Sequence, residues 1–362
     1  MNILIICDQL DHGGAGHVAA LLANGLTARG HSVSLLTNTN KSINYEIDHN
    51  VYVGGFIPKG RNGIVKFVKS LALTRGHIKR NKPDVIIGIL WLCSLIGWIS
   101  SIGKHIPVVA TEHNSFEWPR GTRMPFMQWF PKFYLNKLYD CVTVLTHADK
   151  QIIGDRLKNV FVMSNPLCYN PDNGEIPKKK IILACGRIYD WHQKGFDLII
   201  RAWAKIHMRY KDWQVQIVGD SDSESESYLH QLCNELLVSD SVSIHGGHKE
   251  LLPYYKNAEV FVLPSRNEGF GLVLIEAMSQ QCACVSCNYG GRQAEIINDG
   301  VDGVLCECDN ADSLAEGLIA ILDDEKKRKG IQLRALDKSR QFTLEKISEN
   351  WENLLKSLLD ER

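Results

Sequence analysis

The sequence has 362 residues, in which 41 lysine and arginine side chains balance 41 aspartate and glutamate side chains. This length excludes a single small domain and favours two domains of ordinary size. The eleven cysteines are irregularly spaced, and residues 1–7 lack the basic start and small-residue cleavage site of a signal peptide, so we expect a protein of the reducing cytosol.

Charge is distributed unevenly along the chain. Residues 1–165 carry 18 basic and 10 acidic side chains, and the remaining residues have the opposite imbalance. The first half therefore carries either a surface that meets anions or a basic solvated face.

The first predicted unit is a strand, a turn, a helix and a second strand. Residues 2–7 form an apolar run without alternation, which is typical of a parallel strand covered on both faces. A glycine-rich turn at 12–16 leads into a helical pattern over 18–26, and residues 31–36 predict the next strand.

The glycine turn partly matches a dinucleotide-binding pattern. Gly14, Gly16 and Ala19 have the spacing G-x-G-x-x-A, but Thr37 and Asn38 stand where an acidic residue should close the second strand. We therefore disfavour NAD, and the turn either faces a phosphate or is simply tight.

A basic segment follows at residues 59–82. Its eight basic side chains and no acidic ones are interleaved with apolar residues. The basic residues are Lys59, Arg61, Lys66, Lys69, Arg75, Lys79, Arg80 and Lys82. Such an amphipathic helix either lies on an anionic membrane surface or packs its apolar stripe on the sheet.

Residues 85–103 carry no charge, but we do not expect them to span a membrane. The β-branched run 85–89 predicts a buried strand, 92–101 a short buried helix, and 106–110 a further strand. That last strand ends in polar residues that include His113, at the strand end where α/β folds place their chemistry. His113 either contacts a phosphate, orients a substrate, or is satisfied by the backbone.

An aromatic and basic segment at 118–132 is either a membrane-interface anchor or core. Residues 140–146 and 160–163 predict strands, and the turn at 164–166 marks the end of the first domain. Residues 170–180 are polar and charged, as in a linker.

The second half repeats the plan of the first. Residues 181–185 predict a strand, 196–210 a helix and 213–218 another strand. Arg187 and Lys194 lie between the first strand and the helix, where two cations beside glycines suit a diphosphate.

Two features of this half could suggest a metal, and we discount both. Residues 221–227 read as a polar loop, and the D-x-D pattern at 220–222 sits in its acidic surroundings. The cysteines have C-x-C spacings rather than the paired C-x2-C of zinc sites, so buried thiols in neighbouring strands are favoured. They are Cys282, Cys284, Cys287, Cys306 and Cys308.

The stretch 264–278 joins a predicted strand over 258–263 to a helix over 272–280. Glu268 lies at the mouth of the turn and Glu276 about one turn into the helix, so both can face one ligand. Glycines in the turn leave amides at the helix N-terminus to receive an anion. Residues 343–359 predict a last amphipathic helix.

With these motifs assembled, the whole chain resembles the retaining glycosyltransferases of family 4, with the GT-B fold. The strongest match is E-x7-E, Glu268 and Glu276. The supporting matches are Gly13-Gly14, Glu112-His113, Gly186-Arg187 with Lys194-Gly195, Val218-Gly219-Asp220, and Gly290-Gly291 with Glu295.

The resemblance implies an α/β chain of two Rossmann-like, doubly wound domains that face each other across a cleft. Residues 1–165 are then the acceptor-binding domain and residues 166–342 the nucleotide-sugar-binding domain. Residues 343–362 form a helix that packs back on the first domain.

It also implies roles for individual residues. Arg187 and Lys194 bind the donor diphosphate together with the Gly14 turn, and Glu276 holds the ribose. Glu268 holds the donor sugar, and His113 lies near the transferring sugar and the leaving phosphate. The backbone amides of Phe270, Gly271 and Leu272 assist Glu268.

The implied reaction is transfer of a hexose or N-acetylhexosamine from a nucleotide diphosphate sugar, with UDP favoured, and with retention at the anomeric carbon. No metal or other cofactor is required. The acceptor is a glycan, favoured as lipid-linked, in surface polysaccharide biosynthesis; no nucleic-acid partner is expected.

We expect a cytoplasmic protein whose basic segment meets an anionic surface at the inner face of the cytoplasmic membrane. The alternatives are an NAD-dependent oxidoreductase and a non-catalytic glycan-binding protein.

Overall fold

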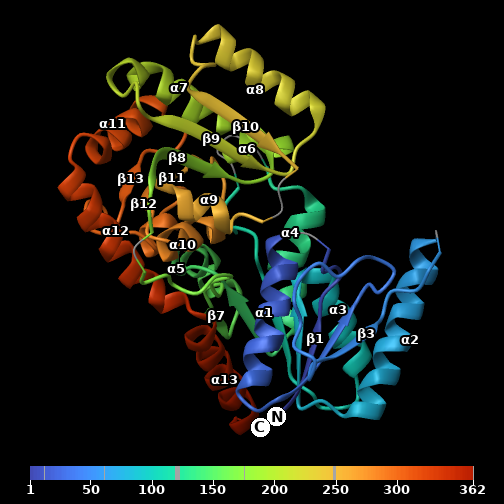
Figure 1. Ribbon diagram of the computed structural model, residues 1–362. Coiled ribbons are helices and arrows are strands. Elements are labelled where there is room, and N and C mark those ends of the chain that lie inside the picture. Colours follow the sequence, from blue (N-terminus) through green and yellow to red (C-terminus); the bar gives the residue numbers. More distant parts are fainter. Residues whose placement is uncertain (12, 61, 119–122, 175, 248–249, 362) are drawn as a thin grey trace. The chain divides into compact units, whose positions relative to one another are not determined.

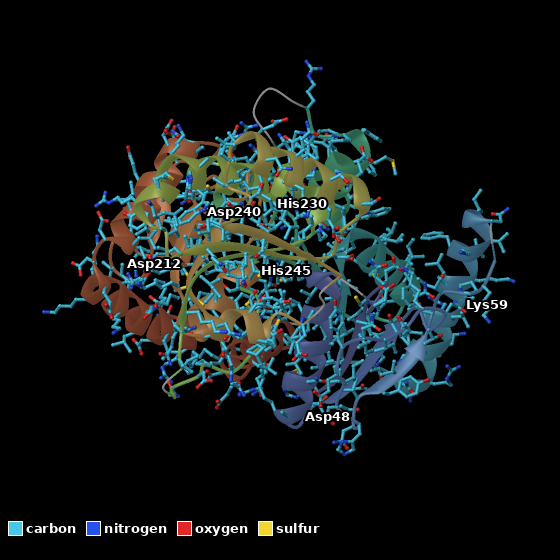
Figure 2. All side chains as sticks on the ribbon, turned by 45° about the horizontal axis from the view of Figure 1, so that its top comes forward. Asp48, Lys59, Asp212, His230, Asp240 and His245 are labelled. Atoms are coloured by element: carbon cyan, nitrogen blue, oxygen red, sulfur yellow. The ribbon has the colours of Figure 1, made fainter. Side chains whose placement is uncertain are left out.

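The computed structural model describes residues 1–11, 13–60, 62–118, 123–174, 176–247 and 250–361. The chain divides into two compact units. Unit 1 comprises Met1–Cys168 and Leu344–Arg362, and unit 2 comprises Tyr169–Thr343. Each unit has one parallel sheet flanked by helices (Figure 1), and side chains fill the space between each sheet and its helices (Figure 2).

Unit 1 contains a seven-stranded sheet in the order β3-β2-β1-β4-β5-β6-β7. Its strands are β1 (Asn2–Ile6), β2 (Ser32–Thr37), β3 (Tyr52–Gly55), β4 (Val85–Ile89), β5 (Val108–Thr111), β6 (Cys141–Val144) and β7 (Val160–Val162). Its helices are α1 (Gly14–Ala28), α2 (Gly63–Asn81), α3 (Leu90–Ser101), α4 (Phe126–Phe133), α5 (His147–Ile153) and α13 (Leu344–Asp360). The direction of the strand order changes between β1 and β4, as in doubly wound folds.

Strand β1 shows why the predicted runs are apolar on both faces. Ile3 and Ile5 belong to a buried cluster with residues of α1 and α13. Leu4 and Ile6 belong to a second cluster with residues of α2 and α3. A central strand with helices on both sides has no solvent-facing positions, so its sequence does not alternate.

The predicted C-terminal helix is present as α13, and it packs against α1 within unit 1. A Cβ at Gly25 would lie 2.0 Å from Ser348 Oγ, so this close approach of the helices needs a glycine. The Arg29 Nε donates to Glu352 across the same contact at 2.5 Å. Hydrogen bonds from Lys356 and Arg29 lower the pKa of Glu352 to about 2.

Unit 2 contains a six-stranded sheet in the order β10-β9-β8-β11-β12-β13. Its strands are β8 (Lys179–Cys185), β9 (Gln214–Gly219), β10 (Val242–Gly246), β11 (Ala258–Leu263), β12 (Ala283–Cys287) and β13 (Val304–Cys306). Its α-helices are α6 (Trp191–Lys194), α7 (Phe196–Ile206), α8 (Ser223–Glu235), α9 (Leu252–Asn257), α10 (Leu272–Ser279), α11 (Ala311–Leu322) and α12 (Glu325–Ser339). Here the strand order changes direction between β8 and β11.

The uncharged segment 85–103 forms strand β4 and helix α3, as predicted. Among the helices of the described ranges, none has the length and apolarity needed to cross a membrane. The predicted fold class, an α/β protein built from two doubly wound domains, is confirmed by the two sheets.

Two local predictions were wrong. Residues 221–227 were expected to be a loop, but α8 begins at Ser223, because the Asp222 side chain accepts a hydrogen bond from Ser225 N at 2.8 Å and caps the helix. The helix expected over 196–210 ends as an α-helix at Ile206 and continues as a short 3-10 turn. Strand β3 was not predicted, since its sequence YVGG has little strand character of its own.

Four of the five clustered cysteines are buried, and Cys308 is partly exposed. Cys284 and Cys287 are buried in β12, and Cys282 is buried just before it. Burial raises the thiol pKa of each of the three above its ordinary value. In the part of the chain that the structure describes, no group of three or more His, Cys, Asp or Glu side chains is arranged to hold a metal.

Candidate active site

Two loops meet at the carboxyl edge of the unit 2 sheet, where its strand order changes direction. One follows β8, carries Arg187 and includes the short helix α6, which ends at Lys194; the other follows β11 and carries Glu268. Because β8 and β11 are hydrogen-bonded neighbours, their loops lie side by side. Doubly wound sheets bind their ligands at this point.

Lys194 and Glu268, which are 74 residues apart, form an ion pair at this edge. Lys194 Nζ lies 2.7 Å from Glu268 Oε1, and only 16% and 13% of the two side chains are exposed. The hydroxyl of Ser265 donates to the same carboxylate oxygen at 2.8 Å. The structure thus brings together two of the residues that the sequence singled out.

Glycines allow the loops to approach each other closely. Gly195 has φ 67°, and a Cβ there would lie 2.0 Å from the carbonyl oxygen of Pro264. Gly219 has φ 155°, and a Cβ there would lie 1.7 Å from the carbonyl oxygen of Gly186. Neither position can accept a side chain without moving backbone.

Arg187 has a different partner from Lys194. Its guanidinium donates to Asp190 Oδ2 at 2.9 Å and lies over the ring of Tyr189, with half of the side chain exposed. The sequence suggested that Arg187 and Lys194 converge, whereas here each cation is paired with a separate carboxylate.

The start of helix α10 lies on the same loop as Glu268. Gly271 has φ 99° and precedes the helix, and no side chain caps this end. Phe270 is buried against the ring of Phe342, and its carbonyl accepts a hydrogen bond from the buried amide of Gln293. Leu272 is the first helical residue. The backbone at 270–272 is therefore held in place at a positive helix end.

Glu276 lies in α10 and is only 6% exposed. Its Oε2 accepts a hydrogen bond from the hydroxyl of Tyr255 at 2.8 Å. Burial raises the pKa of Tyr255 well above its ordinary value, so this phenol keeps its proton and remains a donor. The sequence did not identify Tyr255, because its partner is known only once α9 is placed beside α10.

His113 lies two residues after the end of β5 in unit 1. Its Nε2 lies 3.1 Å from Thr111 Oγ1, whose hydroxyl lies within hydrogen-bond distance of the Gly88 carbonyl. Because that hydroxyl donates its proton to the carbonyl, Nε2 is the ring donor and Nδ1 the acceptor. The Nδ1 atom is buried and has no hydrogen-bond partner among the described residues. Burial lowers the pKa of His113 to about 4, and Asn165 opposes this only in part, so the ring is neutral at physiological pH.

A buried lysine supports the loop that carries His113. Lys132, on α4, donates through Nζ to the carbonyls of Asn114 and Ser115 at 2.9 and 3.0 Å. The same ammonium lies 3.6 Å from Glu112 and over the ring of Phe116. Lys132 was read only as part of an aromatic and basic segment, and nothing in its sequence context shows that it is buried.

Gly14 is the first residue of α1, and a Cβ there would meet no atom of the described residues within 4 Å. A Cβ at Gly16 would instead lie 2.5 Å from the carbonyl oxygen of Gln9. Packing among the described residues therefore explains Gly16 but does not require a glycine at position 14.

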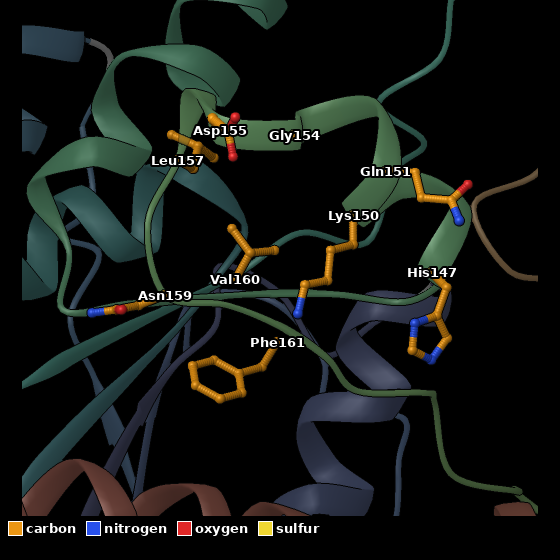
Figure 3. Close-up of a pocket in the computed structure, with 9 residues that line it drawn as sticks. All are labelled: His147, Lys150, Gln151, Gly154, Asp155, Leu157, Asn159, Val160 and Phe161. Carbon is orange, nitrogen blue, oxygen red and sulfur yellow. The ribbon is translucent and has the colours of Figure 1, made fainter.

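A separate cavity of about 610 Å³ lies in unit 1 beside α5 and the edge strand β7 (Figure 3). It is lined by His147, Lys150, Gln151, Gly154, Asp155, Leu157, Asn159, Val160 and Phe161. None of the site residues predicted from the sequence lines it.

Comparison with known proteins identifies the family in both units. Residues 12–167 match the model described as Glycosyltransferase Family 4, and residues 169–336 match Glycosyl transferases group 1. An uncharacterized glycosyltransferase of Haemophilus influenzae is 27% identical over 354 residues, which is 95% of this chain and 96% of that protein.

A Campylobacter jejuni protein named GalNAc-alpha-(1->4)-GalNAc-alpha-(1->3)-diNAcBac-PP-undecaprenol alpha-1,4-N-acetyl-D-galactosaminyltransferase is 26% identical over 364 residues, covering 98% of each chain. Among solved structures, sucrose-phosphate synthase from Thermosynechococcus elongatus has a TM-score of 0.84 at 20% identity over 100% of both chains. Anabaena HepE in complex with UDP has a TM-score of 0.80 at 18% identity, covering 99% of this chain and 100% of that one. The chain belongs to the family 4 glycosyltransferases and has the GT-B fold.

Proposed function

We propose that this glycosyltransferase moves a hexose or N-acetylhexosamine from a UDP-linked donor to a lipid-linked glycan in surface polysaccharide biosynthesis, with retention at the anomeric carbon. The observation that carries the proposal is the Lys194–Glu268 pair at the sheet edge, with Glu276 in the adjoining helix. The similar HepE was solved with UDP and with UDP-glucose, and the similar Campylobacter protein is named for an undecaprenol-linked glycan.

Unit 2 supplies the groups that bind the donor. Lys194 and Arg187 contact the diphosphate, since both are cations on the loop after β8. Glu268 accepts hydrogen bonds from hydroxyls of the donor sugar, and Glu276 from those of the ribose. Lys194 Nζ and Glu268 Oε1 are 2.7 Å apart, so a diphosphate bound by Lys194 and a sugar bound by Glu268 are adjacent, as they are in a nucleotide sugar.

Catalysis rests on stabilising charge in the transition state. The bond between the anomeric carbon and the diphosphate oxygen breaks, and a bond to the acceptor oxygen forms on the same face of the sugar. The acceptor hydroxyl loses its proton to the leaving diphosphate oxygen. Positive charge develops on the sugar and negative charge on the leaving diphosphate. Lys194, Arg187 and the amides of Phe270, Gly271 and Leu272 at the start of α10 stabilise the diphosphate.

His113 has a positioning role toward the sugar in this proposal. A neutral ring whose Nδ1 is an acceptor can accept a hydrogen bond from a hydroxyl, and it supplies no positive charge to a phosphate. The Gly14 turn contributes backbone to the diphosphate, which fits a glycine that internal packing does not require. Residues 1–165 then bind the acceptor, and residues 166–342 bind the donor.

The acceptor lies at the inner face of the cytoplasmic membrane, and unit 1 meets that surface. On α2, Ile64 is 78% and Val68 57% exposed, close in sequence to the exposed Lys69. Lys59, just before this helix, is also exposed (Figure 2). Helix α4 and the turn after it expose Phe126, Met127, Trp129, Phe130, Tyr134 and Leu138. Exposed apolar and aromatic groups beside cations suit an anionic lipid surface.

Sedimentation with vesicles that contain anionic lipid tests this surface. Neutralising Lys66, Lys69, Lys79 and Arg80 together should abolish binding at low salt. Neutralising four lysines of α12 in unit 2, Lys326, Lys327, Lys329 and Lys338, is the matched control and should leave binding intact. If the unmodified protein does not bind the vesicles at low salt, the membrane proposal is wrong.

A panel of nucleotide sugars tests the donor. Thermal shift and release of nucleotide diphosphate should single out UDP-sugars, and calorimetry should detect UDP but not NAD. Glu268→Ala and Lys194→Ala should abolish turnover. Retained activity in both variants, or binding of NAD in place of UDP, would contradict the proposed reaction.

A further inference from the structure

Arg266 lies on the loop after β11, two residues before Glu268, and its guanidinium makes four hydrogen bonds. It donates to both carboxylate oxygens of Asp197 at 2.7 and 2.9 Å and to Asp309 at 2.5 Å. The guanidinium also donates to the carbonyl of His192 at 2.6 Å. Only 17% of its side chain is exposed. Burial lowers the pKa of Arg266, but the hydrogen bonds to Asp197 and Asp309 together outweigh it and raise the pKa above its ordinary value, so the group stays charged.

Arg266 and its neighbour join the two loops of the candidate site. The backbone N–H of Arg266 donates to the carbonyl of Gln193 at 2.8 Å. The side-chain amide of Gln193 donates back to the carbonyl of Asn267 at 3.4 Å. Lys194 directly follows Gln193 in the sequence, and Glu268 directly follows Asn267. These two next residues form the ion pair.

The side chain adds a contact that the backbone bonds cannot supply. It links the His192 carbonyl, two residues before Lys194, to Asp197 in the first turn of α7. A bidentate Arg–carboxylate pair fixes direction as well as distance, which a lysine ammonium does not. One guanidinium therefore contacts the chain on both sides of Lys194, through the backbone carbonyl of His192 and the side chain of Asp197.

We propose that Arg266 is a positioning residue that fixes the Lys194–Glu268 pair for the donor diphosphate. The inference rests on the proposed function of that pair. Arg266 itself is not assigned as a diphosphate ligand, because four of its five N–H groups already donate to Asp197, Asp309 and the His192 carbonyl. Its effect on the donor passes through Lys194.

A double-mutant cycle between Arg266 and Lys194 tests the proposal. Arg266→Gln should weaken UDP binding about tenfold in calorimetry, and Arg266→Lys should not restore it because it lacks the bidentate fork. In a Lys194→Met background, Arg266→Gln should change UDP affinity less than about twofold, since the group it positions is gone. Asp197→Asn keeps the shape of the site and should give a smaller loss that also disappears in that background.

Arg328→Gln is the matched control. Arg328 is also buried in unit 2, where it donates to Glu259 at 2.6 Å and lies over Trp213. This change should lower the melting temperature but leave UDP affinity unchanged. An equal loss of UDP affinity in Arg266→Gln and Arg328→Gln would mean that Arg266 acts only through stability.

Hydrogen exchange separates this inference from the proposed donor. Arg266→Gln should accelerate exchange in peptides covering 192–197 and 264–268, and Arg328→Gln should not. If the unmodified protein binds no UDP but this exchange pattern appears, UDP is not the donor nucleotide, whereas Arg266 still fixes the two loops. Unchanged exchange in those peptides, or an undiminished effect of Arg266→Gln in the Lys194→Met background, would overturn the inference.

Discussion

Removing a single hydroxyl, with Tyr255→Phe, perturbs the way in which the carboxylate of Glu276 is held. The phenol donates to Glu276 Oε2 at 2.8 Å, Tyr255 is fully buried and Glu276 is 6% exposed. A hydrogen bond to a charged group contributes about 1.5–3 kcal/mol. We therefore expect the free energy of unfolding to fall by about 2 kcal/mol.

The same change should also weaken donor binding. Without the phenol, the Glu276 carboxylate can turn away from the position in which it meets the ribose. If about 1.4 kcal/mol is needed to restore that orientation, the Kd for UDP rises tenfold. Isothermal titration with UDP measures the Kd, and chemical denaturation measures the stability.

Tyr210→Phe is the matched control. Tyr210 is buried as well, and its hydroxyl donates to Asp323 at 2.6 Å, but it lies just before β9 at the amino edge of the same sheet. We expect a smaller loss of stability, because 38% of the Asp323 side chain is exposed, and an unchanged Kd for UDP. An equal rise in Kd for both variants, or none for Tyr255→Phe, would refute the assignment of Glu276 as a donor-binding group held by Tyr255.

Three further predictions concern unit 1. Gly14→Ala should leave the free energy of unfolding unchanged or raise it by about 0.5–1 kcal/mol, because a Cβ meets no described atom and alanine favours a helix. The kcat/KM should fall if the backbone at Gly14 approaches the diphosphate, and unchanged kinetics would remove Gly14 from the site. For His113, NMR of the ring should give a pKa near 4 in the folded protein, against about 6.5 in the unfolded protein. The contribution of the neutral ring to stability is therefore constant above about pH 6.5 and declines as the pH falls toward 4. A ring that titrates near 6.5 in the folded protein would contradict this. Lys132→Met should destabilise unit 1 by about 3 kcal/mol, measured by denaturant unfolding, since the Asn114 and Ser115 carbonyls and the Glu112 carboxylate lose a buried cation. A change below about 0.5 kcal/mol would contradict the role of Lys132 in holding the His113 loop.

Most strands could be predicted because a strand buried on both faces needs a continuous apolar run, as in β1 and β4. Strand β3 could not, since Gly54 and Gly55 give it no pattern and it forms only beside β2. Helix α8 was not predicted from the sequence, because its first turn, SESE, is entirely polar and the helix begins at the Asp222 cap.

The candidate site was predictable only where glycines and charges mark loops in the sequence. Lys194 and Glu268 were identified from separate motifs, and the structure shows that they touch. The residues that hold the site were not predictable, because a buried Arg266 looks like any loop arginine until Asp197 is placed beside it. Their roles depend on contacts between segments 69 or more residues apart.

The proposed reaction is tested most directly by supplying a panel of UDP-sugars together with an undecaprenyl-diphosphate-linked glycan and analysing the product by NMR. We expect release of UDP and an α-linked sugar from an α-configured donor, with the activity lost in Glu268→Gln. A product of inverted configuration, or transfer that survives Glu268→Gln undiminished, would contradict the proposed mechanism, and no transfer from any nucleotide sugar would contradict the proposed function.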